Sequence, residues 1–329
     1  MPHPSWRLAA APWRVAAPSW RAAGAAGVAG LAARRWARRC ASSLSTPSPS
    51  SHEAVRATSR VLKKLLDEQT KGGVVVLLGA GASASAGLPD FRTPGTGLYD
   101  NLQEYNLPFA EAIFDLQFYR QNAEPFNRLA RELYPGGVKP TAMHRFVSLL
   151  DEHQLLTRCF TQNIDSLETA AGLRKSMVVA AHGNFDTASC IDCGAPAQED
   201  LVRQSLCEGA EPQQPTCSAC GGKVKPGIVF FGEALPERFF ALAPEIRECR
   251  LLIIAGTSLT VHPFASLPTL ASPQSLRVLA NRELVGQELG LRYVDDVGKN
   301  NDVGDIAFLG DTDAFAKAVA LEVFGLEDL

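Results

Sequence analysis

One stretch of the sequence, GGVVVLLGAGASASAGLPDFR at residues 72–92, constrains the fold most strongly. Val74 to Leu78 form a continuous apolar run, which is typical of a strand buried on both faces of a parallel sheet. The run enters Gly79-Ala-Gly81-Ala-Ser-Ala84, which fits the G-x-G-x-x-[G/A] pattern that brings backbone N–H groups against a pyrophosphate. The stretch therefore predicts the first strand and phosphate loop of a dinucleotide-binding α/β fold.

The residues that follow depart from an ordinary dinucleotide-binding helix. Gly87-Leu-Pro89 interrupts the helix almost at once, because proline has no N–H and restricts the residue before it. The acidic residue that reads the adenosine ribose usually stands about 20 residues on, after the next strand. Asp100 has that spacing, but no strand precedes it. A helix cut short to present Asp90, Phe91 and Arg92 argues against a hydride-transferring dehydrogenase.

Four more short apolar runs indicate further parallel strands. They lie at 158–160, 177–181, 251–255 and 276–280, and each runs into a short polar, loop-like segment: TQNID, HGN, GTS and NRE. An amphipathic pattern over 53–69 predicts a helix before the first strand. Parallel strands end at one edge of a sheet, and doubly wound folds bind their ligands at that edge. We therefore predict a Rossmann-like doubly wound parallel sheet with a shared site at its carboxyl edge.

Two CxxC pairs interrupt this pattern between the third and fourth strands. The pairs are separated by 23 residues and followed by glycines, which is the layout of a four-thiolate zinc ribbon. Disulfides are the competing interpretation, but a reducing compartment and the CxxC geometry favour a tetrahedral ion. The set offers no water-holding position, so the predicted zinc is structural and stabilises a small inserted domain. The predicted ligands are Cys190, Cys193, Cys217 and Cys220.

Charge is distributed unevenly along the 329 residues. Residues 1–52 carry seven Arg and no Lys, Asp or Glu, which leaves 25 basic against 35 acidic residues in the rest of the chain. An acidic body argues against nucleic-acid binding, which needs basic surface to neutralise phosphates. The sequence has no run of 18 or more apolar residues, so we expect no membrane span.

The N-terminal segment has the composition of an organellar transit peptide, which is rich in Arg and Ser and free of acidic residues. A disordered, Ala-rich tail is the alternative. Residues 40–51, CASSLSTPSPSS, predict a linker, so we expect the fold to begin near Glu53. The expected division is a transit peptide and linker at 1–52 and a catalytic domain at 53–329, with a zinc-binding insertion at about 184–226. The expected location is the mitochondrial matrix, with a plastid or the nucleus and cytoplasm as alternatives.

Taken together, the motifs resemble those of the sirtuins, a family of NAD-dependent protein-lysine deacylases. The matching segments are GAGASASAGLPDFR (79–92), GLY (97–99), TQNID (161–165), HG (182–183), the two CxxC pairs, VKPGIVFFGE (224–233), GTSL (256–259) and NRE (281–283). They occur in family order over roughly residues 60 to 325. The chain looks most like the class I, mitochondrial deacetylase members, so the resemblance implies a Rossmann-like large domain, a small zinc domain, and a cleft between them for NAD and an acyl-lysine peptide.

The resemblance also explains the interrupted helix, because sirtuins consume NAD and must reach the bond between nicotinamide and ribose. It implies that backbone amides of the glycine loop hold the phosphates, that Phe91 covers the reactive carbon, and that Asp165 accepts from the nicotinamide carboxamide. Asn163 and Gln162 would hold the nicotinamide ribose, and Asp305 and Ile306 the adenine. The implied NAD-binding residues are Gly79, Ala80, Gly81, Ser83, Asp90, Phe91, Arg92, Tyr99, Gln162, Asn163, Ile164, Asp165, Gly256, Thr257, Ser258, Asn281, Arg282, Glu283, Asp305 and Ile306.

The implied catalytic residues are His182, Asn163 and Asp165. The acetyl-lysine oxygen attacks the ribose C1′ as nicotinamide leaves, and a base must then take a proton from a ribose hydroxyl. His182 follows the strand at 177–181 and is placed for this task, since a histidine with an ordinary pKa near 6.5 is mostly neutral at matrix pH. The products are deacetylated lysine and O-acetyl-ADP-ribose.

VKPGIVFFGE is expected to form the floor of the peptide site, where an extended substrate adds a strand through main-chain hydrogen bonds. Val229 and Phe231 would wall the lysine channel, with Gly232 and Glu233 beside them. Expected partners are acetylated lysine proteins or peptides, with no nucleic acid, no membrane, and a monomer favoured.

Two departures from the family pattern stand in these motifs, and other functions stay open. Ala82 occupies a position where members with GAGIS carry Ile, and Gly227 replaces the Asp of KPDIVFFGE. The alternatives are a mono-ADP-ribosyltransferase, an NAD glycohydrolase or a long-chain deacylase on the same fold, and, from another class, a non-catalytic NAD-binding interaction module.

Overall fold

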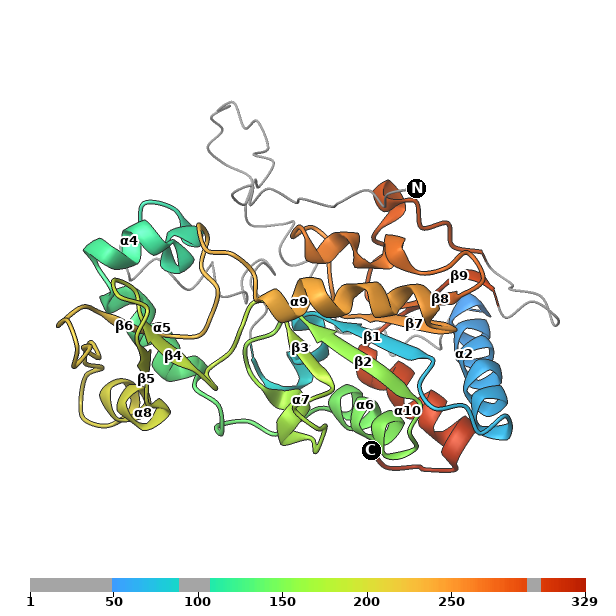
Figure 1. Cartoon of the computed structure of the whole chain (residues 1–329). Helices are drawn as coiled ribbons and strands as arrows, with labels where there is room; N and C mark the ends of the chain where they lie inside the picture. The colour runs from blue at the N-terminus through green and yellow to red at the C-terminus, as the bar shows by residue number, and fades with distance from the viewer. Residues whose placement is uncertain (1–48, 89–106, 295–302) are drawn as a thin grey trace, which may run out of the picture.

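The computed structural model describes residues 49–88, 107–294 and 303–329, which form a large and a small lobe (Figure 1). Asp90, Phe91, Arg92 and Tyr99 lie outside the described residues, as does most of the predicted transit peptide. Within the described part, no helix is long and apolar enough to cross a membrane.

The large lobe is built on a six-stranded, all-parallel sheet with the strand order β3-β2-β1-β7-β8-β9. This is the order of a dinucleotide-binding Rossmann sheet, so the predicted fold class is confirmed. From β1 the chain adds β2 and β3 on one side, and it then crosses to the other side of β1 to add β7, β8 and β9. Folds of this kind bind their ligands at the point between β1 and β7 where the order switches. The strands are β1 (Val74–Leu78), β2 (Leu156–Thr161), β3 (Val178–Ala180), β7 (Leu251–Ala255), β8 (Leu276–Asn281) and β9 (Gly304–Leu309).

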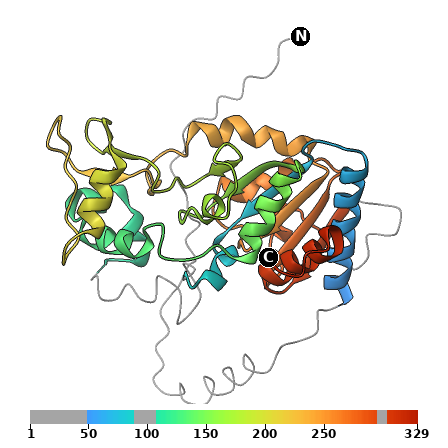
Figure 2. The same ribbon diagram turned by 90° about the horizontal axis from the view of Figure 1, so that it is seen from below.

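Helices cover both faces of this sheet, because alternate residues of each central strand point to opposite sides. Val74, Val76 and Leu78 pack with apolar residues of α2 (Pro49–Asp67), α6 (Ala142–Glu152) and α10 (Thr312–Phe324). Val75 and Leu77 pack instead with residues of α9 (Glu237–Leu242), η5 (Ala243–Glu248) and η6 (Phe264–Leu270). Figure 2 shows the sheet between these two layers. Every residue of β1 is fully buried, as its unbroken apolar run predicts.

The small lobe contains the cysteine motifs and a three-stranded antiparallel sheet of order β5-β4-β6. Its strands are β4 (Ala188–Cys190), β5 (Pro196–Ala197) and β6 (Val224–Pro226), with α8 (Glu199–Cys207) beside them. Three elements from an earlier part of the chain also pack here through Phe114, Tyr119 and Phe126, whose rings all contact that of Phe230: η4 (Ala110–Phe114), α4 (Leu116–Gln121) and α5 (Glu124–Leu133). The lobe therefore draws on two segments, of which the sequence analysis assigned only the second.

Helix α2 starts earlier than the sequence analysis expects. It begins at Pro49, four residues before Glu53, so the predicted linker already enters the folded part. Proline suits the first turn of a helix, where its missing N–H costs nothing. Ser51 is fully buried, and its hydroxyl accepts a hydrogen bond from the Leu309 amide at 3.2 Å. This contact ties the start of α2 to the end of β9.

Candidate active site

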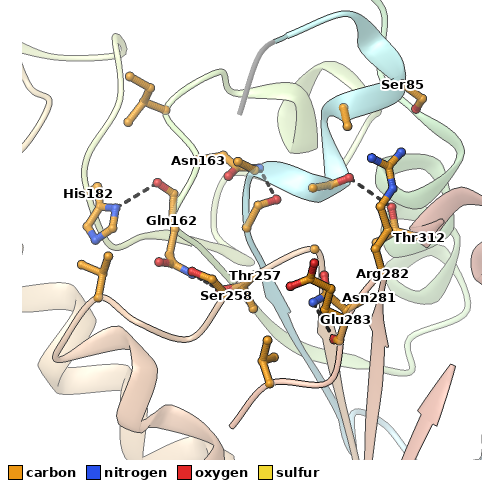
Figure 3. A pocket seen from close by; sticks show the side chains of 18 of the residues that line it. Ser85, Gln162, Asn163, His182, Thr257, Ser258, Asn281, Arg282, Glu283 and Thr312 are labelled. Atoms are coloured by element: carbon orange, nitrogen blue, oxygen red, sulfur yellow. Dashed lines mark hydrogen bonds between the residues drawn. The ribbon is translucent and has the colours of Figure 1, made fainter. Parts of the chain in front are cut away.

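A cavity of about 640 Å³ lies at the carboxyl edge of the parallel sheet, between the two lobes. Its size falls within the usual range for small-molecule sites. Loops that follow β1, β2, β7, β8 and β9 contribute to its walls (Figure 3). The predicted residues that line it are Gly79, Ala80, Gly81, Gln162, Asn163, Ile164, His182, Val229, Phe231, Gly256, Thr257, Ser258, Asn281, Arg282 and Glu283.

The glycines of the β1 loop are required by packing against the β7 loop. A Cβ on Gly79 would lie 2.6 Å from the Gly256 oxygen, and one on Gly81 would lie 2.7 Å from the Gly256 Cα. The Gly79 amide donates to Ala255 at 3.0 Å, and the Gly81 amide donates to Gly256 at 2.8 Å. These two amides therefore hold the strand ends together, which corrects the expectation that they donate to phosphate. The Ala80 amide between them makes no backbone hydrogen bond in the described part of the chain.

Asn163 and Asp165 are fixed by contacts with the β1 loop. The Asn163 side-chain amide donates to the Gly79 carbonyl at 3.1 Å and to the Ser83 hydroxyl at 3.2 Å, which leaves its oxygen as the end free to accept. The Ser83 hydroxyl donates to Asp165 at 2.7 Å, and the Leu167 amide donates to the other Asp165 oxygen at 3.0 Å. Asn163 lines the cavity, whereas Asp165 and Ser83 lie behind its wall.

A chain of hydrogen bonds connects His182 with the β7 loop (Figure 3). The His182 Nδ1 atom lies 3.0 Å from the Gln162 carbonyl oxygen. A carbonyl can only accept, so Nδ1 carries the hydrogen and Nε2 is the basic nitrogen of the neutral ring. The Gln162 side chain donates in turn to the Thr257 hydroxyl at 2.6 Å. Three strands thus contribute to the orientation of the histidine.

The electrostatics of His182 favour a neutral ring. Burial lowers its pKa to about 4, and the hydrogen bond with Gln162 only partly opposes that effect. The pKa is therefore lower than the ordinary value assumed from the sequence. A histidine with this pKa is unprotonated throughout the physiological range, so it can accept a proton at any pH at which the protein works.

The opposite end of the cavity contains Asn281, Arg282 and Glu283 (Figure 3). The Arg282 guanidinium donates to the Asp311 carboxylate at 2.7 Å. Asp311 belongs to the loop after β9, which the sequence analysis missed. Loops at the carboxyl ends of parallel strands form the site, so recognition of β9 as a strand would have identified this loop. Gly310 and Asp311 of this loop line the cavity, together with Thr312 and Asp313 at the start of α10.

Asp305 and Ile306, which we expected near the adenine, lie elsewhere. Both belong to β9, and the structure buries them in the sheet. Asp305 accepts two hydrogen bonds from Arg277, at 2.5 and 2.9 Å, and Ile306 packs in the core. The adenine assignment was therefore wrong for these two residues, because both belong to a buried strand of the sheet.

The predicted peptide floor is joined directly to His182. The Val229 amide donates to the His182 carbonyl at 2.8 Å, and the Phe231 amide donates to the Phe114 carbonyl at 2.8 Å. Val229 and Phe231 both line the cavity, as predicted, whereas Gly232 and Glu233 do not. The floor therefore bridges the histidine loop and the small lobe.

Glu233 has a different contact from the one expected of a substrate-binding residue. It pairs with the buried Lys225 at 3.0 Å and accepts from the Phe230 amide at 2.7 Å. The Lys225 ammonium also donates to the Ile228 carbonyl at 2.5 Å and lies 4.4 Å from the centre of the Phe230 ring. Burial lowers the pKa of Lys225, and the Glu233 carboxylate opposes that shift. This ion pair clamps the floor from beneath.

Gly227 shows why this chain departs from the KPDIVFFGE pattern. A Cβ at Gly227 would lie 2.1 Å from the Thr187 hydroxyl, and the Gly227 amide donates to the Thr187 carbonyl at 2.7 Å. The Thr187 side chain thus fills the space that an Asp would use. Gly183 is equally constrained, since its Cβ would lie 1.9 Å from the Gly227 oxygen.

The four cysteines of the small lobe form one cluster, with their sulfur atoms within 4.8 Å of one another. Cys190 and Cys220 are 3.5 Å apart between sulfurs, and Cys193 and Cys217 are 3.7 Å apart. A disulfide needs about 2.05 Å, whereas a tetrahedron with Zn–S bonds of about 2.3 Å has edges of about 3.8 Å. Backbone amides of Asp192, Ala219 and Gly222 donate to the sulfurs at 3.4 Å, which stabilises thiolates. The cluster fits a structural zinc ion.

The fold and site together define a class: a Rossmann-like protein with a zinc-ribbon lobe and a histidine in a cleft at the switch point of its sheet. A family model described as the Sir2 family matches residues 79–263. This match covers more than half of the chain, and close relatives support it. The chain belongs to the Sir2 family, and the resemblance to sirtuins is confirmed.

Relatives with known names are similar over most of this chain. It is 43% identical over 256 residues to "NAD-dependent protein deacetylase hst2" of Schizosaccharomyces pombe, covering 78% of this chain and 73% of that protein. It is 49% identical over 222 residues to "NAD-dependent protein deacetylase sirtuin-2" of Danio rerio, covering 66% and 58% respectively. For "NAD-dependent protein deacetylase sirtuin-3" of Mus musculus the identity is 47% over 224 residues, covering 68% and 66%.

Proposed function

We propose that this chain is an NAD-dependent protein-lysine deacetylase with NAD as co-substrate and one structural zinc ion. Relatives with that printed name, 43 to 49% identical over 66 to 78% of this chain, support the activity. The observation that carries it is His182, whose basic nitrogen belongs to a neutral ring lining the cavity next to the predicted peptide floor.

The chain's own residues have distinct roles in this proposal. The Ala80 amide is a donor for phosphate, and the Asn163 oxygen is an acceptor for a ribose hydroxyl. The Gln162 bridge holds His182 so that Nε2 takes a proton from the ribose. NAD supplies the electrophilic ribose carbon once nicotinamide departs. The closely packed loops exclude water, so the lysine amide oxygen is the nucleophile that reaches that carbon.

The apolar channel favours acetyl over acidic acyl groups as the group removed from lysine. Val229, Phe231 and Ile228 contribute apolar surface beside His182, and a charged succinyl or malonyl group would lose its hydration there without gaining a charged partner from these three residues. Expected substrates are acetylated lysines in protein segments that can extend along the floor. We also propose that the chain is a monomer and that it is divided as the sequence suggests, with the zinc-binding insertion at about 184–226.

Residues 1–52 would direct the protein to the mitochondrial matrix. Their Arg-rich, acid-free composition supports this proposal. A fusion of these residues to a fluorescent protein tests the idea independently of activity. Co-localisation with a mitochondrial dye is expected, and a diffuse cytosolic signal would leave only the tail interpretation.

The enzymatic proposal is tested by the dependence of nicotinamide release on the acetyl group. The full chain is incubated with NAD and either an acetyl-lysine peptide or the same peptide with unmodified lysine. Release that requires the acetyl peptide is expected. Equal release with both peptides would indicate NAD hydrolysis, and a peptide that gains ADP-ribose would indicate transfer. Binding of NAD without release would indicate an interaction module.

A further inference from the structure

A cluster of three titratable side chains, two of them buried and one half-buried, lies behind the cavity wall at Asn163. It contains His144, Asp165 and Glu168, whose potential ligand atoms are within 4.8 Å of one another. His144 is 0% exposed and Glu168 is 1% exposed. The roles described above use Asp165 but neither of the other two. Titratable groups this deeply buried need hydrogen bonds or a change of protonation state.

Thr141 holds His144 at its Nδ1 atom. His144 is the third residue of α6, and its Nδ1 lies 3.3 Å from the Thr141 amide nitrogen and 2.8 Å from the Thr141 hydroxyl oxygen. Burial lowers the pKa of His144, so the ring is neutral near pH 7. Its Nε2 has no hydrogen-bond partner among the described residues.

Glu168 also has an atom without a hydrogen-bond partner among the described residues. One of its carboxyl oxygens is buried without a partner in the described part of the protein. Burial, and secondly the charge of Asp165, raise its pKa to about 7, while hydrogen bonding from Thr161 lowers it. Asp165 behaves as the carboxylate of the pair, since its oxygens accept from the Ser83 hydroxyl and the Leu167 amide. Burial and repulsion by the neighbouring Asp165 carboxylate both disfavour the charged form of Glu168, so Glu168 carries a proton below about pH 7.

We propose that Glu168 is a positioning residue that holds the proton of this cluster and, beside the buried His144 ring, keeps Asp165 as its single carboxylate behind the cavity wall. This inference rests on the proposed function, since it concerns the same cavity. A ligand whose ring bears positive charge, as the nicotinamide ring of NAD does, would favour a second negative charge in the cluster. Binding of NAD is then linked to release of the Glu168 proton.

The groups around Glu168 support a linkage of this sign. The titratable groups that interact with the Glu168 charge are Asp165 and the buried Cys159 thiol of β2. The pKa of Cys159 is itself raised, first by burial and then by Glu168. His144 in turn faces Asp313 from α10 and Arg145 from its own helix, which act on its charge in opposite directions. The interactions given for Glu168 include no basic side chain. A cationic ligand would therefore be the principal source of positive charge near the cluster.

Titration calorimetry of NAD binding in buffers of different ionisation enthalpy measures the protons released. The full-length wild type at pH 7 should release a few tenths of a proton, and Glu168→Gln should release none while still binding NAD. Glu152→Gln, an exposed residue at the end of α6, is the control and should match the wild type. Equal proton release by wild type and Glu168→Gln would overturn the proposal. Absence of NAD binding in the wild type would count against the proposed function instead.

Thermal unfolding of the same proteins tests the proton without NAD. A carboxyl whose pKa is raised on folding contributes fully below about pH 4.5, and that contribution is lost as pH rises to about 7. Glutamine cannot ionise, so Glu168→Gln should gain roughly 5 °C in Tm relative to wild type between pH 5 and pH 8. A difference in Tm that stays constant over this range would show that Glu168 does not hold the proton.

Discussion

The His182 Nδ1 atom lies 3.0 Å from the Gln162 carbonyl, and this contact decides which ring nitrogen can accept a proton. The same Gln162 donates its side-chain amide to Thr257 at 2.6 Å. Backbone and side chain of one residue thus link the histidine to the β7 loop. The histidine is thus oriented by contacts between the ends of three strands, and each contact can be changed separately to test its role.

His182→Ala should lower the deacetylation kcat by at least about a hundredfold, the range for loss of a general base. NAD binding should change little, because the phosphate loop and the Asn281 end of the cavity are untouched. The comparison is kcat and the NAD dissociation constant for wild type and variant. Wild-type turnover in the variant would remove His182 from the mechanism.

The low pKa of His182 also predicts a pH dependence of stability. The folded pKa of about 4 is below the unfolded value near 6.5, so the unfolded state binds the proton first as pH falls. The wild type should lose up to about 3 kcal/mol relative to His182→Ala as pH falls from 6.5 to 4. Urea unfolding at a series of pH values measures this difference. A stability difference that does not depend on pH would show that folding does not lower the pKa of His182.

Lys225→Met should weaken peptide binding more than catalysis. The change leaves the half-buried Glu233 carboxylate without its ion pair and releases the Ile228 carbonyl, so the floor loses its clamp. We expect the peptide KM to rise about tenfold with a smaller change in kcat and NAD affinity, and stability to fall by about 3 kcal/mol. Lys64→Met, exposed on α2, is the control. An unchanged peptide KM would show that the clamp has no role in binding.

Removal of zinc should unfold the small lobe. Four thiolates with sulfurs 3.5 to 3.7 Å apart repel one another without a cation, and the lobe has only a small core. Chelation or Cys217→Ser should increase proteolysis between residues 184 and 226 and abolish activity, whereas Cys207→Ser should not. Full activity with all four thiols free and metal absent would make the ribbon dispensable.

Gly227→Asp should destabilise this protein even though it restores a common family residue. The new Cβ would meet the Thr187 hydroxyl at 2.1 Å. We expect a loss of about 1 to 3 kcal/mol, typical of overpacking, and recovery of most of it when Thr187→Ala is added. A double-mutant cycle by chemical unfolding measures the coupling. Additive effects would mean that Thr187 is not the obstacle.

Much of the fold was predictable because the strands of the parallel sheet are continuous apolar runs. Five of the six strands, including β1 and β7, follow from such runs and their polar ends. Strand β9 was missed because Asp305 interrupts its apolar pattern. That carboxylate is tolerated inside the sheet only through its paired contact with Arg277, which residue spacing does not reveal.

The site was predictable where the sequence fixes the chemistry and unpredictable where it depends on packing. His182 and Asn163 line the cavity as expected. By contrast, the amides of Gly79 and Gly81 are used by the neighbouring loop, and Glu233 points to Lys225. These differences arise from contacts between residues more than a hundred positions apart or from the burial of a charge, and neither follows from a motif.

The most direct test of the account is identification of the nucleotide product. The full-length protein is incubated with NAD and an acetyl-lysine peptide, and both products are followed by mass spectrometry. The account predicts one O-acetyl-ADP-ribose for each acetyl group lost. Free ADP-ribose with an intact acetyl peptide would contradict it.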